Sequence, residues 1–211
     1  MSRARPYGIV DLAYRPLDPV TASRRARDDG FAFVDTRIEQ DPAELALPVG
    51  CPIAYPKPVP GWCMAPAPYD GAGAWEQTVR WFRAAPGALL EPWTGSSVQS
   101  DDACRAVVQE VPGLRLLLDT GHVAAWGGDP IALLEHAGHV QLRQGAPGAA
   151  QLHVDDSLGR VDFSAVLHRL DELHYRGKIS IEYFDLPELG WGLEDPRAWA
   201  LDLAAHLRGL E

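Results

Sequence analysis

Several apolar segments of this chain end in an ionisable side chain, and this pattern constrains the fold more than any other feature. The clearest segment is Leu116-Leu-Leu-Asp119-Thr-Gly-His122, which reads as a buried strand followed by a carboxylate and an imidazole. Two further apolar segments end in or near Glu91 and Glu182. Apolar strands that each finish in a polar group predict a barrel whose rim carries a site.

A fourth segment, His139-Val-Gln-Leu-Arg143, has polar residues at alternate positions. Because successive side chains of a strand point to opposite faces, His139, Gln141 and Arg143 share one face. His139 and Gln141 fit either a ligand or substrate contact or a satisfied interior polar layer, and both interpretations stay open. Arg143 fits either an anion-binding role or neutralisation of a nearby acid.

The apolar segments alternate regularly with helical patterns along the chain. We expect eight strands, over residues 7–13, 31–37, 52–55, 62–65, 88–91, 114–119, 139–143 and 178–183. Helix-connected parallel strands in this number predict an α/β fold, a (β/α)8 TIM barrel, for which about 250 residues are typical. With 211 residues, the chain predicts a shortened barrel as a single domain over residues 1–211. An open doubly wound sheet is the alternative.

The missing length falls around strands 3 and 4. The connection Pro56-Lys-Pro-Val-Pro-Gly61 is rich in proline and much shorter than the dozen or so residues of a parallel crossover. We therefore expect either a lost helix at this point or two segments that are not both barrel strands.

Capping residues mark the helix boundaries. Asp162 is the expected N-cap of a helix over residues 162–174, and Asp129-Pro130 and Asp195-Pro196 each place Pro at a first helical position. Glycines that follow predicted helices are expected in the left-handed C-cap conformation; they are Gly30, Gly87, Gly113, Gly138 and Gly177.

Charge and cysteine content exclude several classes of function. The net charge of −10 and the pI near 5.1 argue against a nucleic-acid partner. The three cysteines contain no Cys-x-x-Cys pair, so we expect reduced thiols. The chain has no apolar run long enough for a membrane span and no signal-peptide pattern at its start, so we expect a cytoplasmic protein with a small-molecule substrate.

The strand ends supply a candidate metal site. In a parallel barrel the carboxyl ends of all strands meet on one face, so Glu91, Asp119, Gln141 and Glu182 converge there. Carboxylate oxygens suit Mg²⁺ or Mn²⁺, and an added imidazole favours Mn²⁺, Co²⁺ or Zn²⁺. We therefore expect a divalent-metal cofactor held by these four residues.

The order of these motifs resembles the xylose-isomerase-like TIM-barrel family of sugar and sugar-phosphate isomerases and epimerases. Leu-Leu-Glu91-Pro resembles the family's strand-end Glu-Pro, and Asp119-Thr-Gly-His122 is similar to its Asp-x-x-His. The His139 strand resembles its His-x-His strand, and Ile-Glu182-Tyr its closing Glu. The resemblance covers residues 89–183 and departs at Gln141, where the family usually has a histidine ligand.

The resemblance implies that Glu91, Asp119 and Glu182 bind the metal and that Glu91 and Glu182 are the catalytic acid and base. A metal that holds two adjacent oxygens of an α-hydroxycarbonyl acidifies the neighbouring C–H, so a carboxylate can remove that proton. Return of the proton to the opposite face gives epimerisation, and return to the adjacent carbon gives isomerisation. His153, in the loop after the His139 strand, is an alternative ligand.

Four side chains are candidate substrate contacts. The resemblance gives His122 a role at the substrate or behind the ligands, and His139 lies on the face of Gln141. Arg143 can bind a carboxylate or phosphate through its planar fork. Trp93 follows the strand that ends in Glu91, where an aromatic face can cover a sugar.

Three other functions compete with a metal-dependent isomerase or epimerase. The first is a metal-free acid/base lyase or cyclase of a biosynthetic pathway on the same barrel. The second is a non-catalytic binding or partner protein; barrel surface exposed by the shortening also allows a homodimer. The third, an endonuclease acting on abasic DNA, is disfavoured because residues 1–87 contain no histidine and the chain is acidic.

Overall fold

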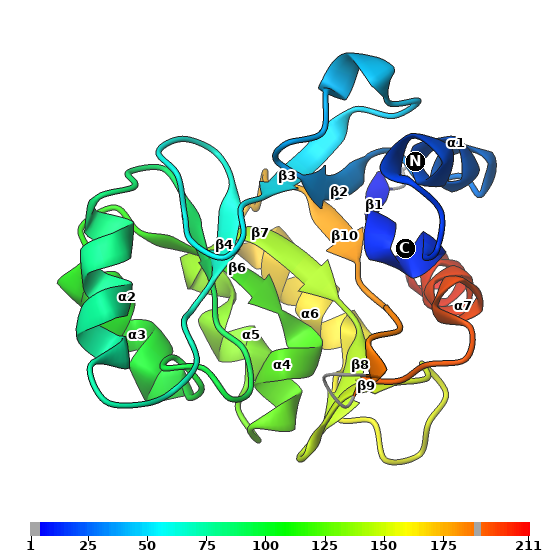
Figure 1. The fold of residues 1–211 in the computed structure, drawn as a ribbon. Coiled ribbons are helices and arrows are strands. Elements are labelled where there is room, and N and C mark those ends of the chain that lie inside the picture. The colour runs from blue at the N-terminus through cyan, green and yellow to red at the C-terminus, as the bar shows by residue number, and fades with distance from the viewer. Residues whose placement is uncertain (1–4, 188–190) are drawn as a thin grey trace.

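Eight parallel strands close into a barrel in the computed structural model, which describes residues 5–187 and 191–211 (Figure 1). The barrel strands are β1 (Tyr7–Val10), β2 (Val34–Arg37), β3 (Val49–Ile53), β4 (Met64–Pro66), β5 (Leu89–Glu91), β6 (Arg115–Asp119), β7 (Ala137–Leu142) and β10 (Ile179–Ile181). Their order around the barrel is β1-β10-β7-β6-β5-β4-β3-β2. The predicted (β/α)8 barrel is confirmed, and strands 3 and 4 both belong to it.

Helices cover the barrel unevenly. The α-helices are α1 (Pro19–Asp28), α2 (Ala74–Arg83), α3 (Asp101–Glu110), α4 (Thr120–Ala125), α5 (Pro130–Leu133), α6 (Phe163–Glu172) and α7 (Pro196–Gly209), and the 3-10 helices are η1 (Asp11–Tyr14), η2 (Pro42–Glu44) and η3 (Leu134–His136). Figure 1 shows α2 and α3 on one side of the barrel and α1 and α7 on the other. Asp129, Asp162 and Asp195 cap α5, α6 and α7 as predicted.

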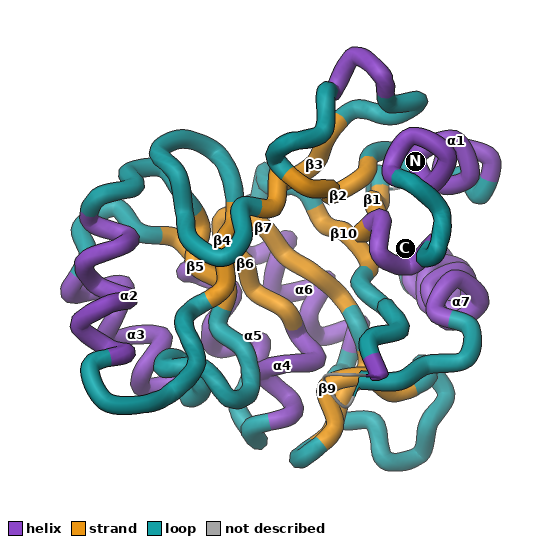
Figure 2. The backbone as a smooth tube through the Cα atoms, viewed as in Figure 1, coloured by secondary structure: helices purple, strands orange, loops and turns teal. Residues whose placement is uncertain are grey.

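The barrel is shortened where the sequence indicated, and over a longer stretch. Figure 2 shows that the chain between β3 and β4 is loop throughout. Only η2 lies between β2 and β3, in a connection that projects from the barrel in Figure 1. Two successive crossovers therefore lack an α-helix, and the sequence analysis located only the second.

A short antiparallel hairpin, β8 (Gln144–Ala146) and β9 (Ala149–Leu152), follows β7 and was not predicted. It packs closely on α4: a Cβ at Gly121 would lie 2.2 Å from the carbonyl oxygen of Ala150 and 2.5 Å from Cγ of Arg143. Only glycine allows this approach. The hairpin and the start of α4 thus enclose the stem of Arg143.

Two of the five glycines that were predicted to adopt the left-handed C-cap conformation do not adopt it. Gly30, Gly87 and Gly113 have φ of +86°, +88° and +81°, as expected for a left-handed residue. Gly138 instead lies inside β7, where a Cβ would meet the side chain of Leu89 at 2.6 Å. After α6 the left-handed residue is His174, with φ of +51°, rather than Gly177.

Apolar side chains fill the barrel below its carboxyl-terminal rim. Cys51, Met64, Leu89 and Leu117 form one buried cluster inside the barrel. A larger cluster fills the space between the strands and the helices. All three cysteines are buried and unpaired, and the described part of the chain contains no helix with the length and apolar character of a membrane span. The interior is thus mostly apolar below the acids at the rim, apart from the buried side chains of Asp35, His139 and Ser180.

Candidate active site

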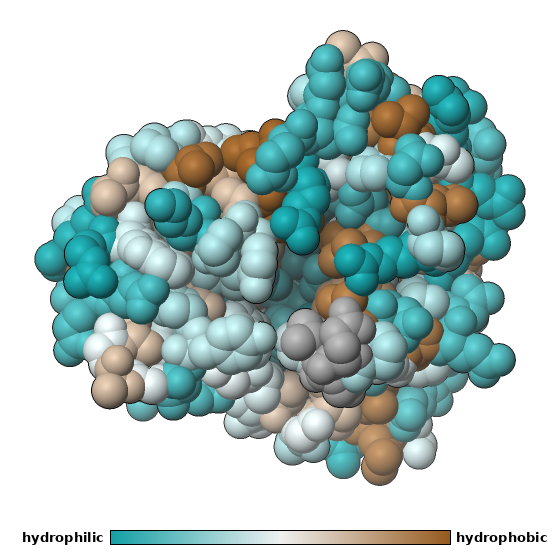
Figure 3. Space-filling view, viewed as in Figure 1, coloured by the Kyte–Doolittle hydropathy of each residue, from teal (hydrophilic) through white to brown (hydrophobic). Residues whose placement is uncertain are grey.

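A cavity of about 560 Å³ opens at the carboxyl ends of the strands. Figure 3 shows a hollow near the centre of this face of the molecule. Glu91, His122 and Glu182 contribute to its lining, and they come from β5, α4 and the end of β10. Aromatic side chains form much of its wall; they are Tyr55, Tyr69, Trp81, Trp93, Phe184 and Trp191.

Glu91 and Glu182, together with Asp11, are the carboxyl groups among the described residues that line the cavity. Glu91 and Glu182 are only 9% and 5% exposed. Burial and the charge of Asp119 raise the pKa of Glu91 to about 8, against the opposing effect of Arg143. Burial also raises the pKa of Glu182 well above its usual value, and Asp119 and Glu91 add to this against Arg143. The pair therefore holds protons at neutral pH and can both accept and donate them.

Asp119 and Arg143 form a buried ion pair beside these acids. Nε of Arg143 donates to Oδ1 of Asp119 at 3.1 Å, and Nη2 donates to Oδ2. Nη2 also lies 3.3 Å from Oε2 of Glu182. Burial alone would raise the pKa of Asp119, but the charge and the hydrogen bonds of Arg143 hold it below its usual value. Asp119 is therefore the ionised member of the acid cluster, and the Arg143 fork is directed at it.

Asp119 also begins α4, as the strand-to-helix pattern of the sequence suggested. Its Oδ1 accepts hydrogen bonds from the backbone N–H groups of Gly121 at 2.7 Å and His122 at 3.3 Å. This is an N-cap arrangement, in which the carboxylate satisfies donors that the helix leaves unpaired. Together with Arg143, these contacts engage both carboxylate oxygens.

The predicted ligand Gln141 lies next to Asp119 in the barrel, since the two residues are register partners on β7 and β6. It is fully buried. Within the described part of the chain neither atom of its side-chain amide has a hydrogen-bond partner. An unpaired amide in a buried site costs free energy, so this position carries a polar group for a reason other than packing.

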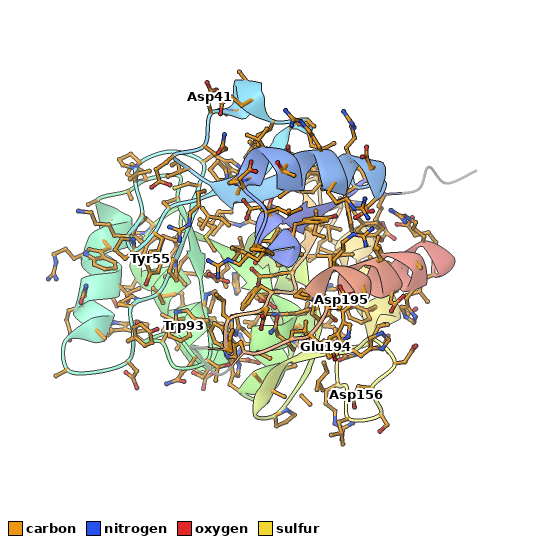
Figure 4. The ribbon with its side chains drawn as sticks, turned by 45° about the vertical axis from the view of Figure 1, so that its right-hand side comes forward. Asp41, Tyr55, Trp93, Asp156, Glu194 and Asp195 are labelled. Atoms are coloured by element: carbon orange, nitrogen blue, oxygen red, sulfur yellow. The ribbon has the colours of Figure 1, made fainter. Side chains whose placement is uncertain are left out.

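Of the predicted substrate contacts, His122 and Trp93 reach the cavity. Nε2 of His122 lies 3.8 Å from Oδ2 of Asp119. Burial, with the charge of Arg143, lowers the pKa of His122 to about 3, so the ring is neutral. Trp93 donates to the carbonyl of Ala67 at 2.7 Å, and Figure 4 shows it on the same side of the barrel as Tyr55. These aromatic rings form a fixed wall.

His139 and Arg143, the other two predicted substrate contacts, are fully buried and do not line the cavity. Nε2 of His139 lies 2.9 Å from both Asp35 Oδ2 and Ser180 Oγ, and Ser180 donates to Asp35 at 2.6 Å. This is the interior polar layer that the sequence left open. The anion-binding role expected for Arg143 is replaced by the ion pair with Asp119.

The alternative ligand His153 lies outside the site. Its Nε2 pairs with Asp202 at 3.0 Å, and its ring packs edge-on against Trp199. The loop that carries it follows the β8–β9 hairpin, which moves it away from the acid cluster.

The cavity residues from the first third of the chain were not among the site residues predicted from the sequence. Asp11, Arg15 and Arg37 line the cavity, and the guanidinium of Arg37 lies 5.4 Å from the ring centre of Tyr55. Arg37 ends β2 and so follows the strand-end pattern that identified the acids. Arg15 lies in the irregular segment after η1, where no sequence signal marks it.

The geometry allows a direct test of the predicted metal site. Ligand atoms of Glu91, Asp119 and His122 lie within 4.8 Å of one another, and the unpaired amide of Gln141 is a suitable oxygen donor. However, an ion that bridges Asp119 and Glu182 needs the space between them, which Nη2 of Arg143 takes. A guanidinium only donates hydrogen bonds, so it cannot be a metal ligand, and its positive charge repels a metal cation. In this arrangement the four predicted ligands do not fit a divalent ion.

The fold and the site together define a parallel barrel with buried acids at the carboxyl ends of its strands. Residues 60–210 match the sequence profile of the xylose isomerase-like TIM barrel. The chain therefore belongs to the xylose isomerase-like TIM-barrel family, as its strand-end motifs predicted. A search of curated protein sequences finds no match.

Several solved structures share this fold over nearly the whole chain. A 3-keto-D-glucoside 4-epimerase from E. coli is 16% identical, with a TM-score of 0.71 and coverage of 98% of this chain and 100% of the other. An L-ribulose 3-epimerase is 14% identical, with a TM-score of 0.70 and coverage of 98% of this chain and 96% of the other. A D-psicose 3-epimerase from Clostridium cellulolyticum is 12% identical, with a TM-score of 0.71 and coverage of 97% of this chain and 99% of the other. At these identities the likeness establishes the fold.

Proposed function

We propose that this protein is an epimerase or isomerase that moves a proton α to a carbonyl on a small sugar-like or hydroxy/oxo-acid substrate. The observation that carries the proposal is the pair Glu91 and Glu182, two buried carboxyl groups that line the same cavity. They belong to β5 and to the end of β10, which are separated around the barrel by β6 and β7. Two carboxyl groups from different strands can address different faces of one carbon atom.

The raised pKa values support the same roles. Glu91, whose pKa is raised to about 8, supplies the carboxylate that removes the α-proton once it ionises. Glu182, whose pKa is raised well above its usual value, is the neutral acid that returns a proton. Asp119 stays ionised beside Arg143 and keeps the cluster from losing both protons at once. Return of the proton to the opposite face inverts the carbon, and return to the neighbouring carbon exchanges aldose and ketose.

The cavity supports a small substrate with an apolar face and a polar or anionic end. Trp93 and Trp191 offer aromatic surfaces to the cavity, and Arg15 and Arg37 offer positive charge. The epimerase titles of the similar solved structures favour a sugar-like compound. We place the protein in the cytoplasm, without a nucleic-acid partner. The metal predicted from the sequence is left out of the mechanism because Arg143 takes its place between Asp119 and Glu182.

That same contact favours one alternative, a metal-free lyase or cyclase that uses the same acid and base. After proton removal, such an enzyme would expel a leaving group or close a ring instead of returning the proton. The two functions differ in the mass of the product: epimerisation and isomerisation conserve it, whereas elimination of water lowers it.

Solvent hydrogen exchange tests the proposal. The protein is incubated in D₂O with a panel of ketoses, 3-keto-glycosides and small hydroxy/oxo acids, and deuterium at the α-carbon is measured by NMR and mass spectrometry. We expect incorporation into at least one compound, lost in Glu91→Gln and Glu182→Gln and kept in Glu76→Gln, whose carboxylate is exposed on α2. Exchange that survives both active-site substitutions would overturn the proposal.

A further inference from the structure

We infer that the guanidinium of Arg143 is the resident cation of this active site and stands in the place where a divalent ion would bridge Asp119 and Glu182. The inference rests on the proposed function for its role in catalysis, but its geometry is independent of that function. It makes Arg143 a positioning residue for the acid cluster, since its side chain is buried and does not reach the cavity.

The backbone of Arg143 is held in place by two hydrogen bonds to one side chain. Oγ1 of Thr120 donates to the carbonyl of Arg143 at 2.8 Å and accepts from its N–H at 3.0 Å. Thr120 follows Asp119 directly, so these bonds fix the start of α4 to the end of β7. The Arg143 side chain consequently starts at a set distance from the carboxylate it meets.

The side chain itself is enclosed on every side by matched partners. Nε and Nη2 bind Asp119, and Nη1 donates to Oε1 of Gln151 at 3.2 Å. The guanidinium carbon lies 5.1 Å from the ring centre of Phe184. Gln151 is also fixed, because its Oε1 accepts the backbone N–H of Phe184 at 3.1 Å. Because each of its three nitrogens donates a hydrogen bond, the guanidinium cannot move away to make space for an ion.

The chain makes room for this side chain at Gly121. A Cβ there would lie 2.5 Å from Cγ of Arg143 and 2.8 Å from its Nε. Gly121 has no positive φ, so its backbone conformation does not explain the glycine. The absence of a side chain serves the passage of the Arg143 stem, which indicates that the arginine is a built part of the site.

The charge of the cluster is consistent with one internal cation. Glu91, Asp119 and Glu182 bring three carboxyl groups together, and Arg143 is the basic group in direct contact with Asp119 and Glu182. Among the described residues, Gln141 has an amide oxygen with no partner in the same layer. Removal of the guanidinium would therefore leave carboxylate and amide oxygens of the kind that Mn²⁺ and Mg²⁺ bind.

The test compares metal binding by the wild-type protein and Arg143→Met, which keeps an apolar stem and removes the charge. Both are dialysed against EDTA and titrated with Mn²⁺, with calorimetry and the EPR signal of free Mn²⁺ as readouts. We expect no stoichiometric binding by the wild type and one Mn²⁺ per chain in the variant, with affinity at least about tenfold tighter. Mn²⁺ should also raise the Tm of the variant alone.

Two controls locate the new site. Asp119→Asn combined with Arg143→Met should lose the Mn²⁺ that the single variant gains. Arg115→Met removes an arginine that instead binds backbone carbonyls of Glu135, His136 and Ala137, and should gain no metal. If Arg143→Met does not fold with or without Mn²⁺, Arg143→Gln is titrated in the same way.

Either of two results would overturn the inference. One is tight stoichiometric Mn²⁺ in the wild-type protein that Asp119→Asn abolishes; the other is a folded Arg143 variant with no gain in metal binding. Neither readout uses turnover, so a failed inference is distinct from a failed function. If no compound shows solvent exchange but the variant gains Mn²⁺, the proposed function fails and the inference about Arg143 stands.

Discussion

The two halves of the barrel mouth are built differently. The half formed by β5, β6, β7 and β10 carries the acids at strand ends and is backed by α-helices, whereas the half formed by β2, β3 and β4 contributes Arg37 and Tyr55 and has two crossovers without an α-helix. In the first half the acids lie at or directly after strand ends; in the second, Arg37 ends β2 and Tyr55 lies in the loop after β3. In the proposed function, the acids of the first half carry the chemistry, and Arg37 and Tyr55 of the second half contribute to substrate recognition.

The largest effect on kcat is expected from substitutions of the two glutamates in the half that carries the acids. Glu182→Gln keeps the shape of the side chain but removes its proton transfer, so kcat should fall by about 10²–10⁴-fold. Glu91→Gln should have an effect of similar size. Turnover of the compound identified by solvent exchange measures both, with Glu76→Gln as the matched exposed control. A loss of less than threefold in both variants would remove the acid pair from the reaction.

The pH dependence of kcat/KM tests the same pair of acids. Because the pKa of Glu91 is raised to about 8, its carboxylate is scarce at pH 6 and forms as the pH rises. If proton abstraction needs one carboxylate, kcat/KM should rise about fiftyfold between pH 6 and pH 8, and fall again when Glu182 also ionises. A profile that is flat from pH 5 to 8 would show that the active base titrates normally.

Gly121 tests the packing around Arg143 in the half that carries the acids. Gly121→Ala places a methyl group 2.2 Å from the carbonyl of Ala150 and against Arg143, so the free energy of unfolding should fall by about 1–3 kcal/mol. Denaturant titration gives the value. Gly71→Ala is a matched control, since a Cβ there meets nothing within 4 Å. Equal stability of both variants would contradict the tight enclosure of Arg143.

The smallest effect falls in the recognition half. Arg37 lines the cavity but is not in contact with the acids, so Arg37→Ala should raise KM about tenfold and leave kcat within a few-fold. Steady-state kinetics with an anionic and a neutral substrate separate charge recognition from packing. A kcat loss as large as that of Glu182→Gln would erase the distinction between the two halves.

The positions of the three acids could be predicted because strand periodicity and strand ends are local signals. Glu91, Asp119 and Glu182 end apolar segments, and parallel strands bring such ends together whatever the loops do. Asp162 and Asp195 were recognisable as caps for the same reason. The shortening around β3 was visible because proline excludes a helix.

The contacts of Arg143 could not be predicted in the same way. Periodicity placed it on the face of Gln141, but the choice between substrate and Asp119 depends on Gly121 and on the β8–β9 hairpin. The hairpin is short and has no strong alternation. Arg15 was missed because it lies in irregular chain, where side-chain direction depends on tertiary packing.

The most direct test of the account is deuterium incorporation from D₂O by protein stripped of metal with EDTA. Proton transfer between Glu91 and Glu182, supported by the charge of Arg143, predicts that exchange continues at an unchanged rate in the chelator and stops in Glu182→Gln. Exchange that disappears with EDTA and returns with added Mn²⁺ would contradict the account.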